Sequence, residues 1–266
     1  QKEQGGLFVS NDGGKSWSMT SSDHRLVQRA WYYIKVFADP KNEDVVYVMS
    51  APALKSTDGG KTWSLLPGEH GDYHDLWINP ENPANIVISD DGGSCISFNG
   101  GGSWSTQSNM PTGQFYRINT DNQFPYRIYG GQQDNTSVSI ASREIGSYGI
   151  STRSWRSSAG GESAFLAFNP DDPRYVAGGS YNGTIEFLDT QNNGSINVMA
   201  APIQYLGRDA KDMKYRFTWN APIICSKHNP NVFYHGGQML LRTDDLGKNW
   251  TEASPDLTRN DKEKQG

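Results

Sequence analysis

The chain has 266 residues and a formal net charge of −5, with 29 glycines and 12% aromatic residues. This acidic balance argues against a nucleic-acid partner, because phosphates bind to a basic protein face. No apolar run approaches the roughly 20 residues that a membrane-spanning helix requires. The two cysteines, Cys95 and Cys225, lie in strand-like runs, and we expect free buried thiols rather than a disulfide. The length and the glycine content fit one large β domain or two small ones, with many tight turns.

An eight-residue phrase recurs along the chain, and its first copy, at residues 10–17, reads SNDGGKSW. It returns as STDGGKTW at 56–63, as SFNGGGSW at 97–104 and as TDDLGKNW at 243–250. The common pattern is Ser/Thr-x-Asp-x-Gly-x-x-Trp, with a short strand-like run on either side. The phrase therefore predicts a hairpin turn between two strands, and its repetition indicates a repeat architecture.

Each residue type in this phrase has a structural role. The Asp accepts hydrogen bonds from its own turn, the Gly supplies a positive φ, and the Trp packs its ring under the turn. This role is favoured over that of a catalytic acid because the turn already uses the carboxylate. Asn99 stands at the Asp position of one copy, which fits a need for an acceptor rather than a charge. The structural residues are Asp12, Trp17, Asp58, Trp63, Asn99, Trp104, Asp245 and Trp250.

A second phrase, Asn or Asp followed by Pro, recurs between these turns, as at Asp39-Pro40 and Asn79-Pro80. Proline ends the strand before it, so the unit is strand A, Pro turn, strand B, loop, strand C, Asp turn and strand D. Four antiparallel strands in about 40–50 residues make one blade of a β-propeller. The five complete blades predicted in this way span residues 31–66, 73–107, 114–157, 163–200 and 217–253.

Ahead of these blades, residues 5–20 supply only strands C and D. Half a blade leaves a raw sheet edge, so we expect its missing strands to come from the remainder of a larger polypeptide or from another chain. The predicted fold is all-β, a propeller of five complete blades and a half blade over residues 1–253. A polar linker or tail at 254–266 follows it.

The repeated phrase is the Asp-box, and the chain resembles the Asp-box (BNR) repeat β-propellers. That group includes sialidases, sortilin-type receptor domains and xyloglucanase-type glycoside hydrolases. The resemblance covers nearly the whole chain, from Gly5 to about Asp261, and it is specific for fold rather than for activity. The propellers that the chain resembles belong to large secreted bacterial proteins, which implies a secreted, periplasmic or cell-surface location.

The strand order places the A–B and C–D turns at one end of every blade and the B–C and D–A loops at the other, around the channel. Carboxylates, amides and aromatic residues gather in the loops of this second end, which is the composition of a sugar or peptide site. Simple solvation of polar loops is the alternative. The candidate ligand-binding residues are Arg29, Trp31, His70, Asp72, His74, Asp91, Gln114, Tyr116, Gln132, Gln133, Asn135, Tyr181, Arg216 and Trp219.

The densest polar group is the run HGDYHD at residues 70–75. Its two histidines and two aspartates are residue types that bind divalent metals. On a strand, however, Asp72 and His74 share one face while Asp75 lies on the other, so at most two or three ligands meet. Hydrogen bonding of these side chains at the start of the strand is favoured, and we expect no metal and no cofactor.

The run DDGG at 90–93 looks like the Asp-x-Gly-Gly of xyloglucanase-type hydrolases, whose Asp is catalytic, and the match falls on Asp90. Glycoside hydrolysis needs two carboxylates about 5–10 Å apart. Glu162 and Asp134, on other predicted blades, are the candidates for the second acid. A glycoside hydrolase acting within a polysaccharide is therefore the second functional hypothesis. The first is a binding or scaffold module that captures a glycan or a peptide at the channel mouth.

A sialidase would need three arginines that clamp the substrate carboxylate, together with a tyrosine nucleophile and a glutamate. Arg29 and Arg216 lie at the loop end, with Tyr215 beside the second of them. No third arginine is evident from another blade. The sialidase hypothesis is therefore disfavoured.

Overall fold

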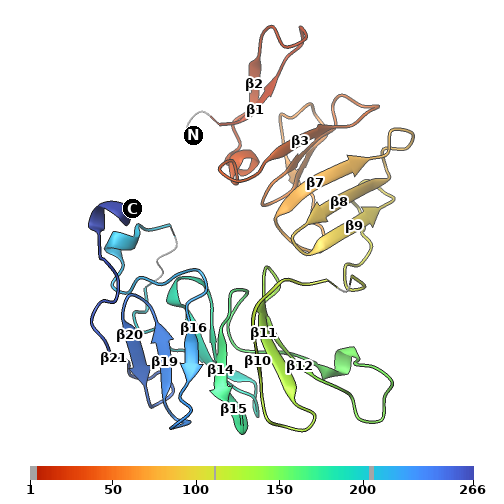
Figure 1. Ribbon diagram of the computed structural model, residues 1–266. Coiled ribbons are helices and arrows are strands. Elements are labelled where there is room, and N and C mark those ends of the chain that lie inside the picture. Colours follow the sequence, from red (N-terminus) through yellow and green to blue (C-terminus); the bar gives the residue numbers. More distant parts are fainter. Residues whose placement is uncertain (1–4, 111, 204–206) are drawn as a thin grey trace. The chain divides into compact units, whose positions relative to one another are not determined.

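The computed structural model describes residues 5–110, 112–203 and 207–266. Its sheets are built from short antiparallel strands, which confirms the all-β prediction (Figure 1). The chain divides into two compact units, Gln1–Thr112 and Gly113–Gly266, and each is described by itself. Within the described ranges, no helix has the length and apolar character needed to cross a membrane.

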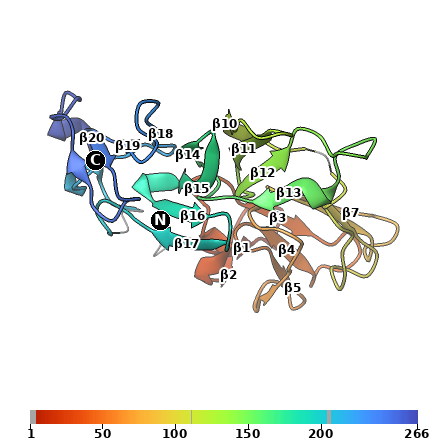
Figure 2. The same ribbon diagram turned by 90° about the horizontal axis from the view of Figure 1, so that it is seen from below.

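Among its described residues, the first unit contains three sheets whose strands follow one another in chain order. Figure 2 shows β3, β4 and β5 of the second of these sheets in that order. Its elements are β1 (Leu7–Val9), β2 (Ser18–Ser21), the 3-10 helix η1 (His24–Val27), β3 (Lys35–Ala38), β4 (Val46–Met49), β5 (Leu54–Ser56), β6 (Ser64–Leu65), β7 (Tyr73–Ile78), β8 (Ile86–Asp90) and β9 (Gly93–Ser97). They form the sheets β1–β2, β3–β6 and β7–β9.

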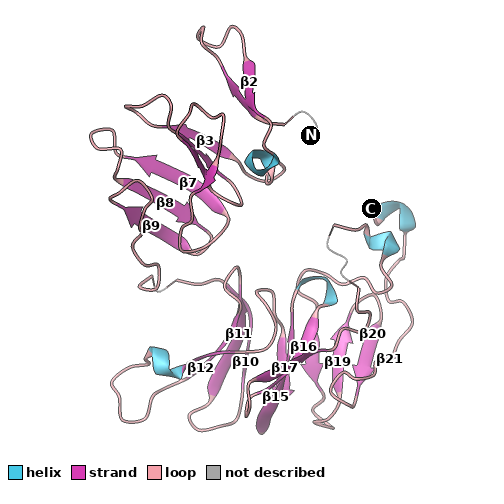
Figure 3. Cartoon of the chain, turned by 180° about the vertical axis from the view of Figure 1, so that it is seen from behind, coloured by secondary structure: helices cyan, strands magenta, loops and turns pink. Residues whose placement is uncertain are grey.

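The second unit contains three four-stranded sheets, β10–β13, β14–β17 and β18–β21. Its strands are β10 (Phe115–Thr120), β11 (Arg127–Gln132), β12 (Ser137–Ala141), β13 (Trp155–Ser157), β14 (Leu166–Asn169), β15 (Asp172–Gly179), β16 (Ile185–Asp189), β17 (Gly194–Asn197), β18 (Ile223–Cys225), β19 (Phe233–Gly236), β20 (Leu240–Thr243) and β21 (Thr251–Glu252). In the described part of this unit, helix is confined to short 3-10 turns (Figure 3), which are η2 (Thr152–Ser154), η3 (Tyr181–Gly183), η4 (Ala210–Asp212) and η5 (Lys262–Lys264).

The predicted repeat units coincide with these sheets, with one difference. The unit at 73–107 has three strands instead of four. After Trp104 the backbone returns beside β9, where the Ser105 N–H donates to the Ile96 carbonyl at 2.9 Å, but the described residues 98–110 form no further strand. The assembly of the sheets into a propeller stays a prediction, as does the domain boundary after residue 253.

Buried side chains on the strands join neighbouring sheets, and along β8 they alternate with half-buried ones. In the first unit, Ile86 and Ile88 of β8 are fully buried in one core with Met49 of β4. In the second unit, Phe187 and Phe233 meet edge to face, with ring centroids 4.9 Å apart. Each such side chain contributes about 1.5–3 kcal/mol when fully buried. Within a unit, this packing sets consecutive sheets side by side and gathers their loops.

The four Asp-box turns share one set of hydrogen bonds. In the second copy, the Gly60 N–H donates to Ser56 Oγ at 2.9 Å, and the Thr62 N–H donates to Asp58 Oδ1 at 2.9 Å. The Thr62 hydroxyl donates to Asp58 Oδ2 at 2.6 Å, and this bond is the largest of the effects that lower the pKa of Asp58. Equivalent bonds hold the other three copies. The Asp or Asn side chain of each box is thus hydrogen-bonded within its own turn.

The Gly of the box pattern has a positive φ in each copy, whereas the tryptophans differ in burial, because Trp17 remains 63% exposed. Gly60 has a φ of +85° and Gly101 a φ of +92°. A Cβ at Gly60 would lie 2.4 Å from the Leu7 side chain, so the turn packs directly on the preceding sheet. The Trp250 indole donates to the Val198 carbonyl at 2.7 Å, again on the preceding sheet.

The box turns lie beside the Pro turns of the same sheet, as the strand order requires. The Gly59 N–H donates to the Asp44 carbonyl at 2.9 Å, and the Gly100 N–H donates to the Ala84 carbonyl at 2.8 Å. The B–C and D–A loops therefore lie at the opposite end of these sheets. We call that opposite end the loop end.

Both cysteines are free thiols. Cys95 is buried, as predicted, whereas Cys225 is only half-buried. Cys225 lies in β18, the outer strand of its sheet, and an outer strand is covered less completely than an inner one.

Candidate functional site

In the second unit, loops of three different sheets meet in a hydrogen-bonded cluster. The Trp219 indole N–H, ahead of β18, donates to the Tyr116 hydroxyl of β10 at 2.9 Å. That hydroxyl donates in turn to Gln133 Oε1, in the β11–β12 loop. Gln133 Nε2 donates to Asp134 Oδ1 at 2.7 Å and to Glu162 Oε2 at 3.3 Å, ahead of β14. We call Tyr116, Gln133, Asp134, Glu162, Tyr181 and Trp219 the loop-end cluster.

Two aromatic rings form one side of the loop-end cluster. Tyr181, in η3, stacks on Trp219 with centroids 5.0 Å apart and an angle of 17° between the planes. Trp219 remains 44% exposed although its indole N–H is hydrogen-bonded. A fixed and accessible aromatic face of this kind suits stacking against the apolar face of a sugar ring.

Backbone geometry fixes the polar side of the cluster. Asp134 adopts a φ of +61°, which Asp tolerates better than most residues, so the β11–β12 loop turns tightly. Its N–H donates to Glu162 Oε2 at 2.9 Å, and the Gln133 N–H donates to the Gln114 carbonyl at 2.9 Å. The amide of Asn135 donates to the Gln133 carbonyl at 3.3 Å. Buried Gln132 ends β11 beside them.

The cluster brings two carboxylates close together. Because both accept from Gln133 Nε2, at 2.7 Å and 3.3 Å, Asp134 Oδ1 and Glu162 Oε2 lie at most 6.0 Å apart. Paired carboxyl groups of glycoside hydrolases stand about 5–5.5 Å apart in retaining enzymes and 6.5–9.5 Å apart in inverting ones. The two acids proposed from separate predicted blades thus share one amide.

Arg216 also lies at the loop end of the second unit, but its side chain bonds to the segment after β21 rather than to the loop-end cluster. Its guanidinium donates to Asp256 Oδ2 at 2.8 Å and to Thr258 Oγ1 at 2.8 Å. Hydrogen bonds from Thr258 and then from Arg216 hold the pKa of Asp256 at about 2. The Leu257 N–H also donates to the Gln238 carbonyl at 2.7 Å, so the segment after β21 lies against the second unit.

The first unit has its own polar group at the loop end. The Arg29 guanidinium lies 2.7 Å from Asp72 Oδ1, and the Tyr33 hydroxyl donates to the same oxygen at 2.7 Å. Burial and then this bond raise the pKa of Tyr33. His74 Nε2 lies 2.8 Å from Asp91 Oδ1, and the His74 ring stacks on Tyr33 at 4.0 Å.

An exposed pair of aromatic rings adjoins this group. Trp31 is 71% exposed and Tyr32 is 67% exposed, and their rings stack with centroids 5.6 Å apart. Tyr33 was not among the candidates, although the run of three aromatic residues at 31–33 was the available signal.

Asp90 occupies a structural position. It is buried, and its Oδ1 accepts from the backbone N–H groups of Gly92 at 2.9 Å and Gly93 at 3.0 Å. Gln107 Nε2 donates to both Asp90 oxygens, at 2.8 and 2.9 Å. The carboxylate therefore holds the β8–β9 turn, and sequence reasoning missed its partner Gln107.

The polar side chains of residues 70–75 point to different partners rather than to one common site. Asp72 turns to Arg29, His74 to Asp91 and Asp75 to Lys35, at 2.9 Å. His70 Nδ1 lies 3.2 Å from the Gly71 carbonyl. Among the described residues, no three His, Cys, Asp or Glu side chains are placed to hold one metal ion.

The two arginines of the sialidase hypothesis lie in different units, and each pairs with a carboxylate of the chain itself, Arg29 with Asp72 and Arg216 with Asp256. The Tyr215 hydroxyl donates to Glu252 Oε1 at 3.0 Å.

A sequence model of the BNR/Asp-box repeat matches residues 8–19 and 54–65. The chain is thus an all-β protein that carries BNR/Asp-box repeats, at the first two copies identified above. No curated protein matches the chain.

The solved structures that are similar to the chain include three propeller proteins at low sequence identity. The GH74 xyloglucanase from Xanthomonas campestris is 15% identical with a TM-score of 0.36, over 93% of this chain and 42% of that one. The GH74 enzyme from Niastella koreensis is 12% identical with a TM-score of 0.35, over 81% and 37%. YCF48 from Cyanidioschyzon merolae is 18% identical with a TM-score of 0.34, over 94% and 79%. The chain spans less than half the length of either GH74 protein.

Proposed function

We propose that this chain is part of a β-propeller that binds a carbohydrate at its loop end, without turnover. The observation that carries the proposal is the loop-end cluster, in which the Tyr116 hydroxyl connects the stacked rings of Tyr181 and Trp219 to the amide of Gln133. Sugar sites combine an aromatic platform with a few fixed polar groups, and this cluster supplies both. The polar groups hold one another in place, so little ordering is needed when a ligand arrives.

The proposal extends to the setting of the protein. A polysaccharide ligand implies a secreted, periplasmic or cell-surface location. We further propose that strands from the remainder of the polypeptide, or from another chain, complete the sheet β1–β2 and the propeller.

The test measures oligosaccharide binding by calorimetry for the intact chain and for Trp219→Ala. The ligands are a panel of neutral and acidic polysaccharide fragments. Loss of the platform should weaken binding at least tenfold, as for a central aromatic contact. Trp155→Ala is the matched control, because Trp155 is 47% exposed in the same unit but lies in β13, outside the cluster. Equal binding by both variants would refute the proposed site, and binding of extended peptides alone would redirect the proposal to a peptide ligand.

A glycoside hydrolase is the second candidate, favoured by the separation of at most 6.0 Å between Asp134 Oδ1 and Glu162 Oε2. This observation favours Asp134 and Glu162 as the catalytic pair over any pair that includes Asp90. In this case the wild-type chain releases reducing ends, and Glu162→Gln lowers the rate at least a hundredfold, the scale of general acid–base catalysis.

Glu144→Gln is the control for the hydrolase, because Glu144 also accepts a backbone N–H, from Ser151 at 2.9 Å, but lies in the loop between β12 and β13, outside the cluster. It should leave the rate unchanged. A wild-type chain that binds a polysaccharide and releases no reducing ends leaves binding as the function.

A further inference from the structure

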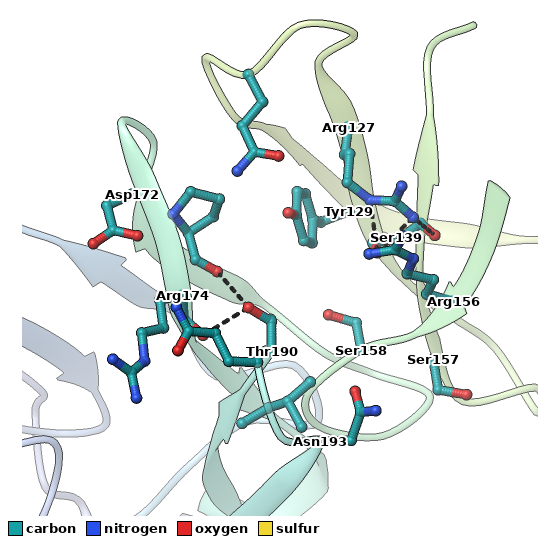
Figure 4. Close-up of a pocket in the computed structure, with 14 residues that line it drawn as sticks. Arg127, Tyr129, Ser139, Arg156, Ser157, Ser158, Asp172, Arg174, Thr190 and Asn193 are labelled. Atoms are coloured by element: carbon teal, nitrogen blue, oxygen red, sulfur yellow. Dashed lines mark hydrogen bonds between the residues drawn. The ribbon is translucent and has the colours of Figure 1, made fainter. Parts of the chain in front are cut away.

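The second unit contains a cavity of about 760 Å³ between the sheets β10–β13 and β14–β17 (Figure 4). Most of its lining comes from the β10–β11 turn, the start of β15, the β16–β17 turn and the outer strand β13. None of the loop-end cluster residues lines it. Its volume falls within the range of small-ligand sites, about 300–1,000 Å³.

Arg127 is held in this cavity by neutral groups. Its guanidinium Nη2 donates to the carbonyls of Ser139 at 2.9 Å and Ser154 at 2.7 Å, and its Nε donates to Ser139 Oγ at 3.3 Å. Burial and then the nearby charge of Arg156 lower the pKa of Arg127. Within the described ranges, no carboxylate forms an ion pair with Arg127, and its Nη1 donates no hydrogen bond.

Arg156, on the outer strand β13, lies on the same side of the cavity as Arg127 and Ser139 (Figure 4). Its guanidinium forms no hydrogen bond or ion pair with any described residue. Two adjacent guanidinium groups repel each other, and their unused N–H donors match the oxygens of a planar or tetrahedral anion.

The acidic groups nearby do not neutralise this pair directly. The buried Asp121 accepts from the Arg127 backbone N–H at 2.8 Å and from the Tyr129 hydroxyl at 2.9 Å. Asp189 forms an ion pair with Arg174 at 3.0 Å. Asp172 lies with Arg174 on the opposite side of the cavity (Figure 4).

We propose that this cavity binds an oxyanion group, a carboxylate, sulfate ester or phosphate ester, between the guanidinium groups of Arg127 and Arg156. Ser158 and Asn193 line the same space and supply neutral donors. The site is independent of the loop-end cluster and of the function proposed for it.

The experiment follows thermal unfolding of the intact chain at pH 7 while sulfate, phosphate, acetate or glucuronate is titrated against sodium chloride of equal ionic strength. A bound anion raises Tm along a saturable curve, whereas the general stabilisation by excluded salts does not saturate. The four anions separate a sulfate or phosphate source from a carboxylate source. Arg156→Gln should abolish the saturable part. Arg153→Gln should retain it, because this control removes the same charge from η2, outside the cavity lining.

A saturable shift of equal size in Arg156→Gln would overturn the proposal, as would its absence for all four anions in the wild-type chain. Arg156→Lys is the second variant and keeps the charge should the first fail to fold. It loses the planar fork of donors, so the anion should bind at least several-fold more weakly. Unchanged affinity in Arg156→Lys would overturn the role given to the fork.

Discussion

At the residue scale, the Asp-box positions require hydrogen-bond acceptors with a fixed direction. Asn99 demonstrates this, because its Oδ1 accepts from the Ser103 N–H at 2.8 Å as the aspartates do in their own turns. Its Nδ2 donates to Ser103 Oγ at 3.0 Å, so the direction of the second bond is reversed. The turn therefore survives the loss of charge, provided that one oxygen remains in place.

We expect Asp58→Asn to be tolerated and Asp58→Ala to destabilise the first unit. The asparagine keeps an oxygen for the Thr62 N–H, whereas alanine leaves the turn donors of Thr62 and Lys61 without their acceptor. Thermal unfolding should show a Tm lower by a few degrees for alanine and nearly unchanged for asparagine. Equal losses in the two variants would show that charge, rather than acceptance, matters.

The aspartates also predict an acid-dependent loss of stability. Hydrogen bonds from Ser16 and Asn249 lower the pKa values of Asp12 and Asp245 from 3.8 to about 2, and bonds from Thr62 lower that of Asp58 in the same direction. A lowered folded-state pKa gives stability that is complete above the unfolded value and is lost as the pH falls through the folded value. Stability should therefore decline from about pH 4 toward pH 2.

The triple variant Asp12→Asn/Asp58→Asn/Asp245→Asn tests this pH dependence. It removes the three titrations and leaves the turns in the form seen at Asn99, so its Tm should fall less steeply over the same pH range. Parallel Tm profiles for the variant and the wild-type chain would contradict the assignment.

At the element scale, the boxes set the packing of one sheet on the next. Gly60 and Gly14 occupy equivalent positions with nearly equal φ values, +85° and +88°. A Cβ at Gly60 would lie 2.4 Å from Leu7 of β1, whereas at Gly14 the nearest atom is 3.9 Å away, in Trp17. The same turn therefore meets a neighbouring sheet in one copy and open space in the other.

We expect Gly60→Ala to destabilise the chain more than Gly14→Ala. Both variants incur the strain of a side chain at positive φ, about 1–2 kcal/mol. Only Gly60→Ala also forces the Leu7 side chain aside, which adds about 1 kcal/mol or more. Urea unfolding of the two variants measures the difference, and equal losses would show that the β1–β2 sheet does not pack firmly on β3–β6.

At the scale of the whole molecule, the sheet β1–β2 has two strands among the described residues, whereas most of the other sheets have four. Apolar side chains on it remain exposed, with Phe8 at 45%, Met19 at 46% and Trp17 at 63%. An open edge with apolar side chains favours pairing with further strands. This is the structural support for the proposal that strands from elsewhere complete the sheet.

Hydrogen exchange tests the completion of this sheet. In the isolated chain, the amides of 7–9 and 18–21 should exchange far faster than those of the buried strand β4, because open edges fray. Where the proposed additional strands are present, the same amides should become protected while β4 stays unchanged. Protection of β1–β2 equal to that of β4 in a monomer of the isolated chain would contradict the proposal.

The sequence by itself determined the box turns, the division into sheets and the strands apart from a fourth one in the unit at 73–107, because these depend on local chemistry that repeats. The Asp, Gly and Trp of each box specify a turn within eight residues, and the prolines mark where strands end. The sequence likewise placed Gln133, Glu162 and Trp219 at one end, because an antiparallel unit fixes which loops lie together.

Only the tertiary structure decided which candidates meet. Trp219 reaches Tyr116 across more than a hundred residues, and Arg127 and Arg156 face one cavity although neither was a candidate. Asp90 resembled a catalytic acid by its neighbours in sequence, but its carboxylate is engaged by Gln107, which the fold brings back to it. Side-chain partners depend on how sheets pack on one another, and that packing is the product of many weak contacts that no local motif encodes.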